Sequence, residues 1–301
     1  MQKIIIHEVG LRDGLQMEKQ VVTTEQKIKW INGLMDAGVD IIQVGSFVHP
    51  EKVPQMADTD QLFTELNKNK KSKAILSGLV LNEIGLDRAM NCGVEMLCMG
   101  VSASETHSKK NTGMSIAEAT ECIVAMAKQA VTASKRIQVS VQSAFGCGFE
   151  GPVPHERVLG IVRKYLEAGL KNISLADTAG HATPDQVEKL YEAIFKLDRS
   201  LEAACHFHNT YGIGLANTYA ALKVGVQNFE SSVAGLGGCP FTKVAAGNVC
   251  TEDFVHAIQR MGFRKEINLT KLIDLAKEYS AFFNREMPGL VYKTGIVPVK
   301  Q

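Results

Sequence analysis

The feature of this sequence that most restricts its fold is the alternation of short apolar, β-rich runs with longer amphipathic segments. The β-rich runs cover residues 3–8, 41–46, 74–80, 95–101, 136–142, 172–176, 201–207 and 228–233. Helical patterns follow at residues 24–37, 59–67, 84–92, 115–134, 154–168, 184–197, 215–224 and 251–261, and several open with Ser, Thr or Pro, as helices prefer. Eight strands, each followed by a helix, predict an α/β protein with a (β/α)8 fold, the TIM barrel.

A faint internal repeat supports this prediction. A glycine followed by Val or Leu stands just before a predicted strand at Gly38, Gly93, Gly169 and Gly225, where a left-handed residue would end the preceding helix. The spacings fit units of roughly 25 to 28 residues, and eight such units make a barrel of roughly 200 to 250 residues. We therefore expect a catalytic barrel at residues 1–267. Residues 268–301 are expected to form a C-terminal helix and tail that pack on the barrel or on a second subunit.

Composition excludes several classes of protein. Hydrophobic residues make up 45% of the 301 residues, charged ones 22%, and the net charge is +1, so neither nucleic acid nor a membrane surface is an expected partner. The chain has no run of about eighteen apolar residues, and charged residues soon follow its first apolar run, so we expect a cytoplasmic protein without a signal peptide or a membrane span. Its seven cysteines include no C-x-x-C pair, which fits neither a disulfide framework nor a structural zinc site.

A histidine pair closes the seventh predicted strand. His206 and His208 are two residues apart, so both imidazoles point to the same side of the strand. A His-x-His pair alone also occurs as satisfied core or surface groups. In a closed barrel, however, strands one, seven and eight are neighbours, and Asp13 and Asn248 follow strands one and eight. Functional groups gather at these strand ends, so we predict a metal site made by Asp13, His206, His208 and Asn248.

The predicted ligands restrict which ion would bind. Two imidazoles, a carboxylate and a carboxamide oxygen suit a divalent cation that keeps open positions, with Mg²⁺ or Mn²⁺ favoured and Zn²⁺ second. A substrate with neighbouring oxygens would chelate the ion at those open positions.

Three further residues have alternative interpretations. Arg12 is either a structural ion-pair partner or a fixed cation that stabilises an enolate oxygen. Asp177 would orient a metal-bound histidine, accept a substrate hydrogen bond, or cap the helix near Thr183. Cys239 follows two glycines and is either tolerated in a turn or a general acid or base in a loop that closes over the barrel mouth. The glycines of that loop would alternatively bind a phosphate.

Several motifs together resemble 3-hydroxy-3-methylglutaryl-CoA lyases, and the resemblance runs from about residue 3 to residue 284. The motifs are EVGLRDGLQ at residues 8–16, SFVHP at 46–50 with VPQM at 53–56, HFHNTYG at 206–212, SSVAGLGGCP at 231–240 and AGN at 246–248. The loop that contains Cys239 is the most specific of them. The resemblance implies a metal-dependent retro-Claisen cleavage of a branched 3-hydroxyacyl-CoA thioester to acetyl-CoA and a keto acid such as acetoacetate. It also implies a homodimer.

The resemblance assigns roles to individual residues. Asp13, His206, His208 and Asn248 match the metal ligands. Arg12 and Cys239 match the enolate-stabilising arginine and the proton-transferring cysteine, so Arg12, Cys239, Asp13 and His206 are the expected catalytic residues. Arg12, Gln43, Ser46 and Asp177 are the expected substrate-binding residues.

The chain departs from the pattern of these lyases at three positions. Leu11 replaces the usual proline and Asn209 the usual aspartate, but neither change removes a ligand. Gln43 replaces a substrate-facing glutamate, and its amide neither accepts a proton nor offsets positive charge. We therefore expect either a different acyl group or slower cleavage of the parent substrate.

Two other classes of function compete with the lyase. Claisen-condensing acyltransferases of the citramalate or isopropylmalate synthase kind share the barrel and the His-x-His pair, but they usually carry a further C-terminal region and lack the cysteine loop. A barrel kept only for binding or regulation would not need the metal ligands, Arg12 and Cys239.

Overall fold

Eight parallel strands form a closed barrel in the computed structural model, in the order β1 to β8. The structure describes residues 3–70, 72–238 and 247–298. The strands are β1 (Ile5–Glu8), β2 (Ile41–Ser46), β3 (Ile75–Leu79), β4 (Met96–Ser102), β5 (Arg136–Gln142), β6 (Asn172–Asp177), β7 (Glu202–Phe207) and β8 (Asn228–Ser231). The predicted TIM barrel is confirmed.

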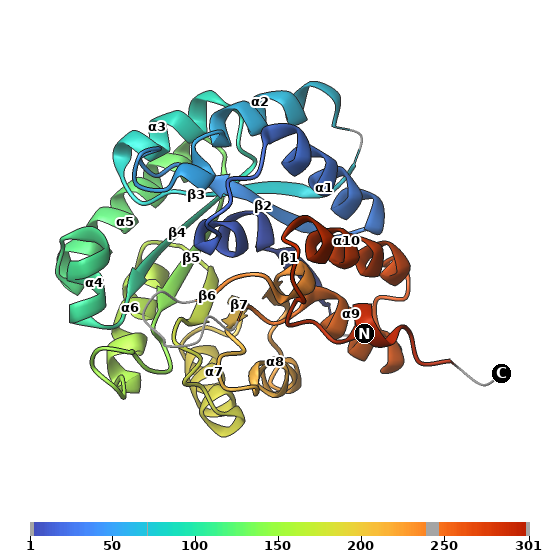
Figure 1. Ribbon diagram of the computed structural model, residues 1–301. Helices are drawn as coiled ribbons and strands as arrows, with labels where there is room; N and C mark the ends of the chain where they lie inside the picture. Colours follow the sequence, from blue (N-terminus) through green and yellow to red (C-terminus); the bar gives the residue numbers. More distant parts are fainter. Residues whose placement is uncertain (1–2, 71, 239–246, 299–301) are drawn as a thin grey trace.

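Helices surround the barrel, as Figure 1 shows. They are α1 (Thr24–Ala37), α2 (Thr59–Asn69), α3 (Glu83–Asn91), α4 (Glu105–Thr112), α5 (Ile116–Thr132), α6 (His155–Glu167), α7 (Pro184–Leu197), α8 (Gly214–Lys223), α9 (Thr251–Arg260), α10 (Leu269–Phe282) and α11 (Val291–Thr294). The four repeat glycines have φ of +86°, +77°, +78° and +99°, the left-handed conformation expected before each following strand. No helix within the described ranges is long and apolar enough to cross a membrane.

Helix α4 was not predicted from the sequence. Its residues are mostly polar, so it lacks the apolar period that marks a helix. The Ser104 side chain caps its start by accepting from the backbone amide of His107, and Gly113 ends it with φ of +78°. Local capping therefore defines this helix.

A buried carboxylate closes the ring between the first and last strands. Strand β1 pairs with β8, with Glu8 opposite Ser231. One carboxylate oxygen of Glu8 accepts from the amides of Gly10 and Val233, each at 2.9 Å, and the other accepts from the Thr251 hydroxyl at 2.5 Å. Glu8 thus joins the loops that follow both strands.

The C-terminal helix α10 packs on α1, where Trp30 and Tyr279 lie with ring centroids 4.1 Å apart. Both side chains are almost fully buried. This contact supports the proposal that residues 268–301 pack on the barrel of residues 1–267.

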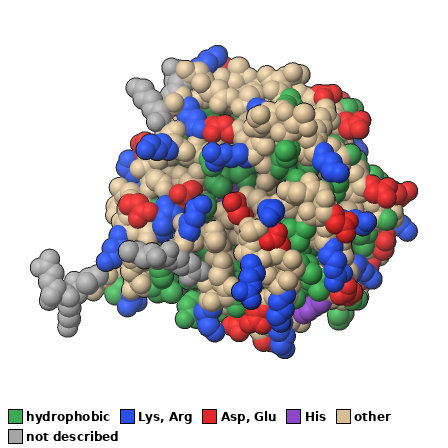
Figure 2. Space-filling view, turned by 180° about the vertical axis from the view of Figure 1, so that it is seen from behind, with side chains coloured by type: hydrophobic (Ala, Val, Ile, Leu, Met, Phe, Trp, Pro, Cys, Tyr) green, Lys and Arg blue, Asp and Glu red, His purple; other side chains and the backbone are tan. Residues whose placement is uncertain are grey.

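Side chains inside the barrel form an apolar bottom and a polar upper part. Ile41 and Met96 make a buried cluster with Ile5 and Ile75, at the start of their strands. Two residues along β2, Gln43 replaces an apolar side chain on the same face. On the outer surface, basic and acidic side chains are interspersed over the face in Figure 2.

Candidate metal and acyl-binding site

Three predicted metal ligands converge at the carboxyl ends of β1 and β7. The Nε2 atoms of His206 and His208 lie 3.1 Å apart. Oδ2 of Asp13 lies 3.6 Å from Nε2 of His208 and 4.0 Å from Nε2 of His206. All three side chains are buried, and their ligand atoms lie within 4.8 Å of one another. They form a candidate metal site.

Backbone geometry places Asp13 in this group. After β1 the chain turns in a short π-helix, Gly10–Gly14, in which the Asp13 amide donates to the Val9 carbonyl at 2.8 Å. This turn directs the carboxylate toward the end of β7.

Asn248 joins the same group from the loop after β8. It forms an isolated bridge with His208, and its Nδ2 donates to Oδ2 of Asp13 at 2.9 Å and to the Leu236 carbonyl at 3.1 Å. Its Oδ1 is buried and has no hydrogen-bond partner in the part of the chain that the structure describes. A buried oxygen without a partner is rare and fits a metal ligand.

Charged neighbours control ionisation at the site. Burial opposes the charged form of Asp13, but Arg12 and the two imidazoles outweigh it and hold the pKa of this carboxyl well below its usual range. Burial also opposes the charged form of His206, but Glu230 and Asp13 raise its pKa. The carboxylate of Asp13 is therefore available to a cation near neutral pH.

Arg12 is fixed at the edge of the site by two neighbours. Its Nη1 donates to Oδ1 of Asp13 at 2.6 Å, and its Nε donates to Oε1 of Gln43. Gln43 therefore orients the guanidinium group through a neutral hydrogen bond, where a glutamate would form an ion pair.

Glu230 is a site residue that the sequence analysis missed. It lies opposite His206 in the β7–β8 register, and its Oε2 is 3.2 Å from Nδ1 of His206. Its Oε1 accepts from the Ser174 hydroxyl at 2.8 Å. A carboxylate at Nδ1 leaves Nε2 of His206 free to bind a metal. The sequence feature that could have indicated Glu230 is its position on the eighth predicted strand, two residues after Asn228.

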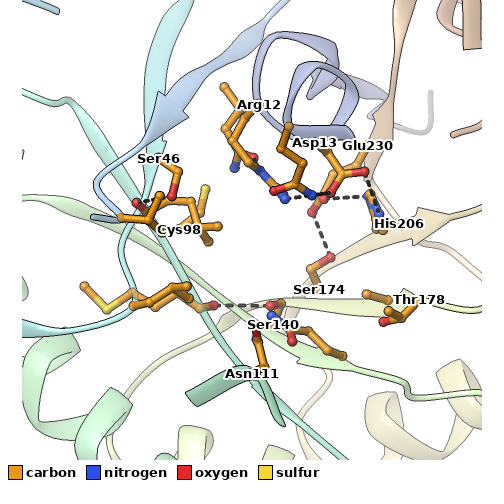
Figure 3. Close-up of a pocket in the computed structure, with 18 of the residues that line it drawn as sticks. Arg12, Asp13, Ser46, Cys98, Asn111, Ser140, Ser174, Thr178, His206 and Glu230 are labelled. Atoms are coloured by element: carbon orange, nitrogen blue, oxygen red, sulfur yellow. Dashed lines mark hydrogen bonds and ion pairs between the residues drawn. The ribbon is translucent and has the colours of Figure 1, made fainter. Parts of the chain in front are cut away.

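A cavity of about 380 Å³ opens beside the ligand group. Arg12, Gln43, Ser46 and Glu230 line it, together with residues of β4, β5 and β6. In Figure 3, Arg12, Asp13, His206 and Glu230 gather on one side, while Ser46, Cys98, Ser140 and Ser174 lie around the rest of the cavity. The metal group and a binding space are thus contiguous.

Asp177 does not cap α7, because the N-cap of that helix is Thr183, and Asp177 instead holds the loop that precedes it. Its two carboxylate oxygens accept from the amides of His181 at 2.8 Å and Ala182 at 3.1 Å. Burial raises its pKa to about 6. Asp177 is not among the described residues that line the cavity, so its role in substrate binding stays a prediction. Cys239 lies outside the described residues, although the adjacent Gly238 lines the cavity.

Comparisons with known proteins agree with this geometry. The HMGL-like family model matches residues 3–278. The hydroxymethylglutaryl-CoA lyase of Bacillus subtilis is 36% identical over 288 residues, 96% of either chain. The 3-hydroxy-3-isohexenylglutaryl-CoA/hydroxymethylglutaryl-CoA lyase of Pseudomonas aeruginosa is 35% identical over 284 residues, 94% of either chain. The structure of an Acinetobacter baumannii HMG-CoA lyase, in complex with coenzyme A and 3-methylmalate, superposes with a TM-score of 0.91 at 35% identity, covering 99% of this chain and 98% of that one.

Proposed function

Because the chain belongs to the HMGL-like family of carbon–carbon lyases, we propose that it cleaves 3-hydroxy-3-methylglutaryl-CoA or a close analogue. The products are acetyl-CoA and a keto acid such as acetoacetate. The observation that carries the proposal is the convergence of Asp13, His206 and His208 at the edge of a cavity that Arg12 also lines.

We propose that Asp13, His206, His208 and the Oδ1 of Asn248 hold a divalent cation, with Mg²⁺ or Mn²⁺ favoured over Zn²⁺. The two imidazole Nε2 atoms lie 3.1 Å apart, and Oδ2 of Asp13 lies 3.6 Å and 4.0 Å from them, so all three would be within reach of one cation. The unpartnered Oδ1 of Asn248 supports a fourth ligand. When bound, such a cation would lower the pKa of the substrate's tertiary hydroxyl and orient its neighbouring oxygens.

The reaction requires the C2–C3 bond of the thioester to break as the tertiary hydroxyl gives its proton to a water molecule in the cavity. The electron pair of that bond passes to C2 and gives the enolate of acetyl-CoA, which then takes up a proton. Arg12 lines the cavity with its guanidinium held by Asp13 and Gln43, which supports a role in stabilising the enolate oxygen without reorganisation. Ser46 also lines the cavity and is proposed to bind the acyl group.

We assign delivery of the C2 proton to Cys239, on the basis of the resemblance. The position of Gly238 at the cavity supports this assignment. The coenzyme A thioester substrate is supported by the ligands in the Acinetobacter baumannii structure. A cytoplasmic homodimer is proposed from the resemblance and the sequence, and light scattering in solution would test the dimer.

Acetyl-CoA release tests the proposal. Purified protein would be stripped with EDTA, supplied with Mg²⁺, Mn²⁺ or Zn²⁺, and given 3-hydroxy-3-methylglutaryl-CoA. We expect metal-dependent formation of acetyl-CoA and acetoacetate. Release of free CoA from acetyl-CoA and a 2-keto acid, without this cleavage, would instead indicate the condensing transferase.

Two cysteine variants distinguish an enzyme from a protein that only binds the substrate. Cys239→Ala is expected to lose most turnover while keeping its metal affinity and thermal stability. Cys122→Ala, on α5 and away from the cavity, is the matched control and should retain activity. Equal activity of both variants would remove Cys239 from the mechanism.

A further inference from the structure

The deep wall of the cavity, formed by Cys98, Gln138, Ser140 and Ser174, is polar. These residues come from β4, β5 and β6, and all four line the cavity. Barrel interiors are usually filled by branched apolar side chains. Short polar side chains here leave space and offer hydrogen bonds.

Gln138 carries an unused hydrogen-bonding group at this wall. Its side chain is 3% exposed, and Cys98 donates its thiol to Oε1 at 3.6 Å. The Nε2 of Gln138 is buried and has no partner among the residues that the structure describes. An amide placed in this way destabilises the empty protein, and a ligand atom that pairs with it removes that cost.

The serines of the deep wall are already committed as donors. Ser140 donates to the Met99 carbonyl at 3.3 Å, and Ser174 donates to Glu230 at 2.8 Å. Gly100, beside Ser140 in the register, has no side chain, and a Cβ there would lie 2.0 Å from the Ser140 hydroxyl oxygen. Gly100 therefore lets Ser140 lie back against β4, which keeps the cavity open.

The charge around the deep wall disfavours an anion. Glu230 contributes a carboxylate next to Ser174. The Lys and Arg among the described lining residues are Arg12 and Lys52, which lie in the loops after β1 and β2, on the side of the mouth. A second carboxylate bound at the deep wall would face Glu230, because the cationic groups nearby are already paired, His206 with Glu230 and Arg12 with Asp13.

We propose that the deep wall selects an acyl group whose 3-substituent is longer than methyl and ends in a neutral hydroxyl or carbonyl, with Gln138 as the specificity-determining residue. This inference rests on the proposed lyase function. The cavity would recognise a polar, uncharged 3-substituent rather than an alkyl or an anionic one.

Four thioesters that differ only at the 3-position test the inference: methyl, propyl, 2-hydroxyethyl and 2-carboxyethyl. The propyl and 2-hydroxyethyl groups are nearly isosteric, so the ratio of their kcat/KM values isolates the hydrogen bond. We expect the 2-hydroxyethyl substrate to exceed the propyl substrate by about 10-fold or more, since a buried polar group left unpaired by a substrate lowers its turnover. Equal values, a preference for propyl, or a preference for carboxyethyl would overturn the proposal.

Two glutamine variants test whether Gln138 is the residue that recognises the 3-substituent. Gln138→Leu should bring the hydroxyethyl to propyl ratio close to one. Gln142→Leu, the same change four residues further toward the mouth on β5, should leave the ratio within about twofold of wild type. A ratio that persists in Gln138→Leu, or collapses in Gln142→Leu, contradicts the assignment. Should Gln138→Leu fail to fold, the wild-type substrate panel and Gln138→Met still decide.

The panel also separates this inference from the lyase proposal. Metal-dependent cleavage of the methyl substrate with no cleavage of the larger substrates would refute the deep-wall inference alone. Failure to release acetyl-CoA from any of the four substrates would refute the lyase itself.

Discussion

Replacing Glu230 by glutamine should weaken metal binding, because it removes a charge behind the proposed metal ligand His206 without changing side-chain volume much. Oε2 of Glu230 lies 3.2 Å from Nδ1 of His206, and both side chains are 8% exposed. Burial opposes the charged form of Glu230, but His206 outweighs it and holds the pKa of this carboxyl below its usual value. Glu230 is therefore an anion at neutral pH.

The geometry sets the size of the effect. At an effective dielectric constant of about 20, unit charges 3.2 Å apart interact by about 5 kcal/mol, an upper bound because a ligating imidazole carries only part of a charge. Loss of a carboxylate behind a metal-bound histidine typically costs 10- to 100-fold in affinity, which is about 1.4 to 2.7 kcal/mol. We expect Glu230→Gln to raise the Kd for Mn²⁺ by that factor.

Calorimetric titration of EDTA-stripped protein with Mn²⁺ measures this Kd directly, without relying on turnover. Glu192→Gln, an exposed position on α7, is the matched control and should bind as wild type does. Glu230→Asp keeps the charge at a greater distance from His206, so its Kd for Mn²⁺ should lie between those of wild type and Glu230→Gln. A Kd for Glu230→Gln within twofold of wild type would refute the reasoning.

Three further changes should have measurable effects. Gln43→Glu places a carboxylate against Nε of Arg12 and should raise kcat for 3-hydroxy-3-methylglutaryl-CoA; unchanged or lower turnover counts against it. Burial lowers the pKa of His7 to about 4, so the unfolded chain binds more protons below pH 6.5, and acidification from pH 7.5 to 5 should cost about 2 kcal/mol through this group. Urea unfolding in EDTA measures this loss of unfolding free energy, which should be smaller by that amount in His7→Gln. Identical pH dependence of wild type and His7→Gln contradicts the assignment. Tyr279→Phe removes a buried hydroxyl without a described partner and should raise the free energy of unfolding by about 1 kcal/mol; a loss of stability in the same urea assay argues against it.

The barrel could be predicted from the sequence because its signals are local and repeated. Alternation of strand and helix patterns, with a left-handed glycine before four of the strands, fixes the number and order of the elements. Helix α4 was missed because its polar sequence has no apolar period, and it depends on the Ser104 cap instead.

The grouping of Asp13, His206 and His208 was also predictable, since closure of the barrel makes the first and seventh strand ends near neighbours. Glu230 was missed because a lone acidic residue in a strand resembles a solvent-facing one until the register shows it opposite His206. The unpaired amide of Gln138 depends on side-chain packing between strands, which no sequence pattern reports.

The pairing of β1 with β8, reinforced by Glu8, has a consequence for biosynthesis. Asp13 leaves the ribosome early, but Asn248 and the Thr251 hydroxyl that anchors Glu8 emerge only after most of the polypeptide has been made. A nascent chain arrested before that point lacks both, so it should sequester the cation poorly. If these residues hold the proposed cation, its high-affinity binding is deferred to the last stage of translation.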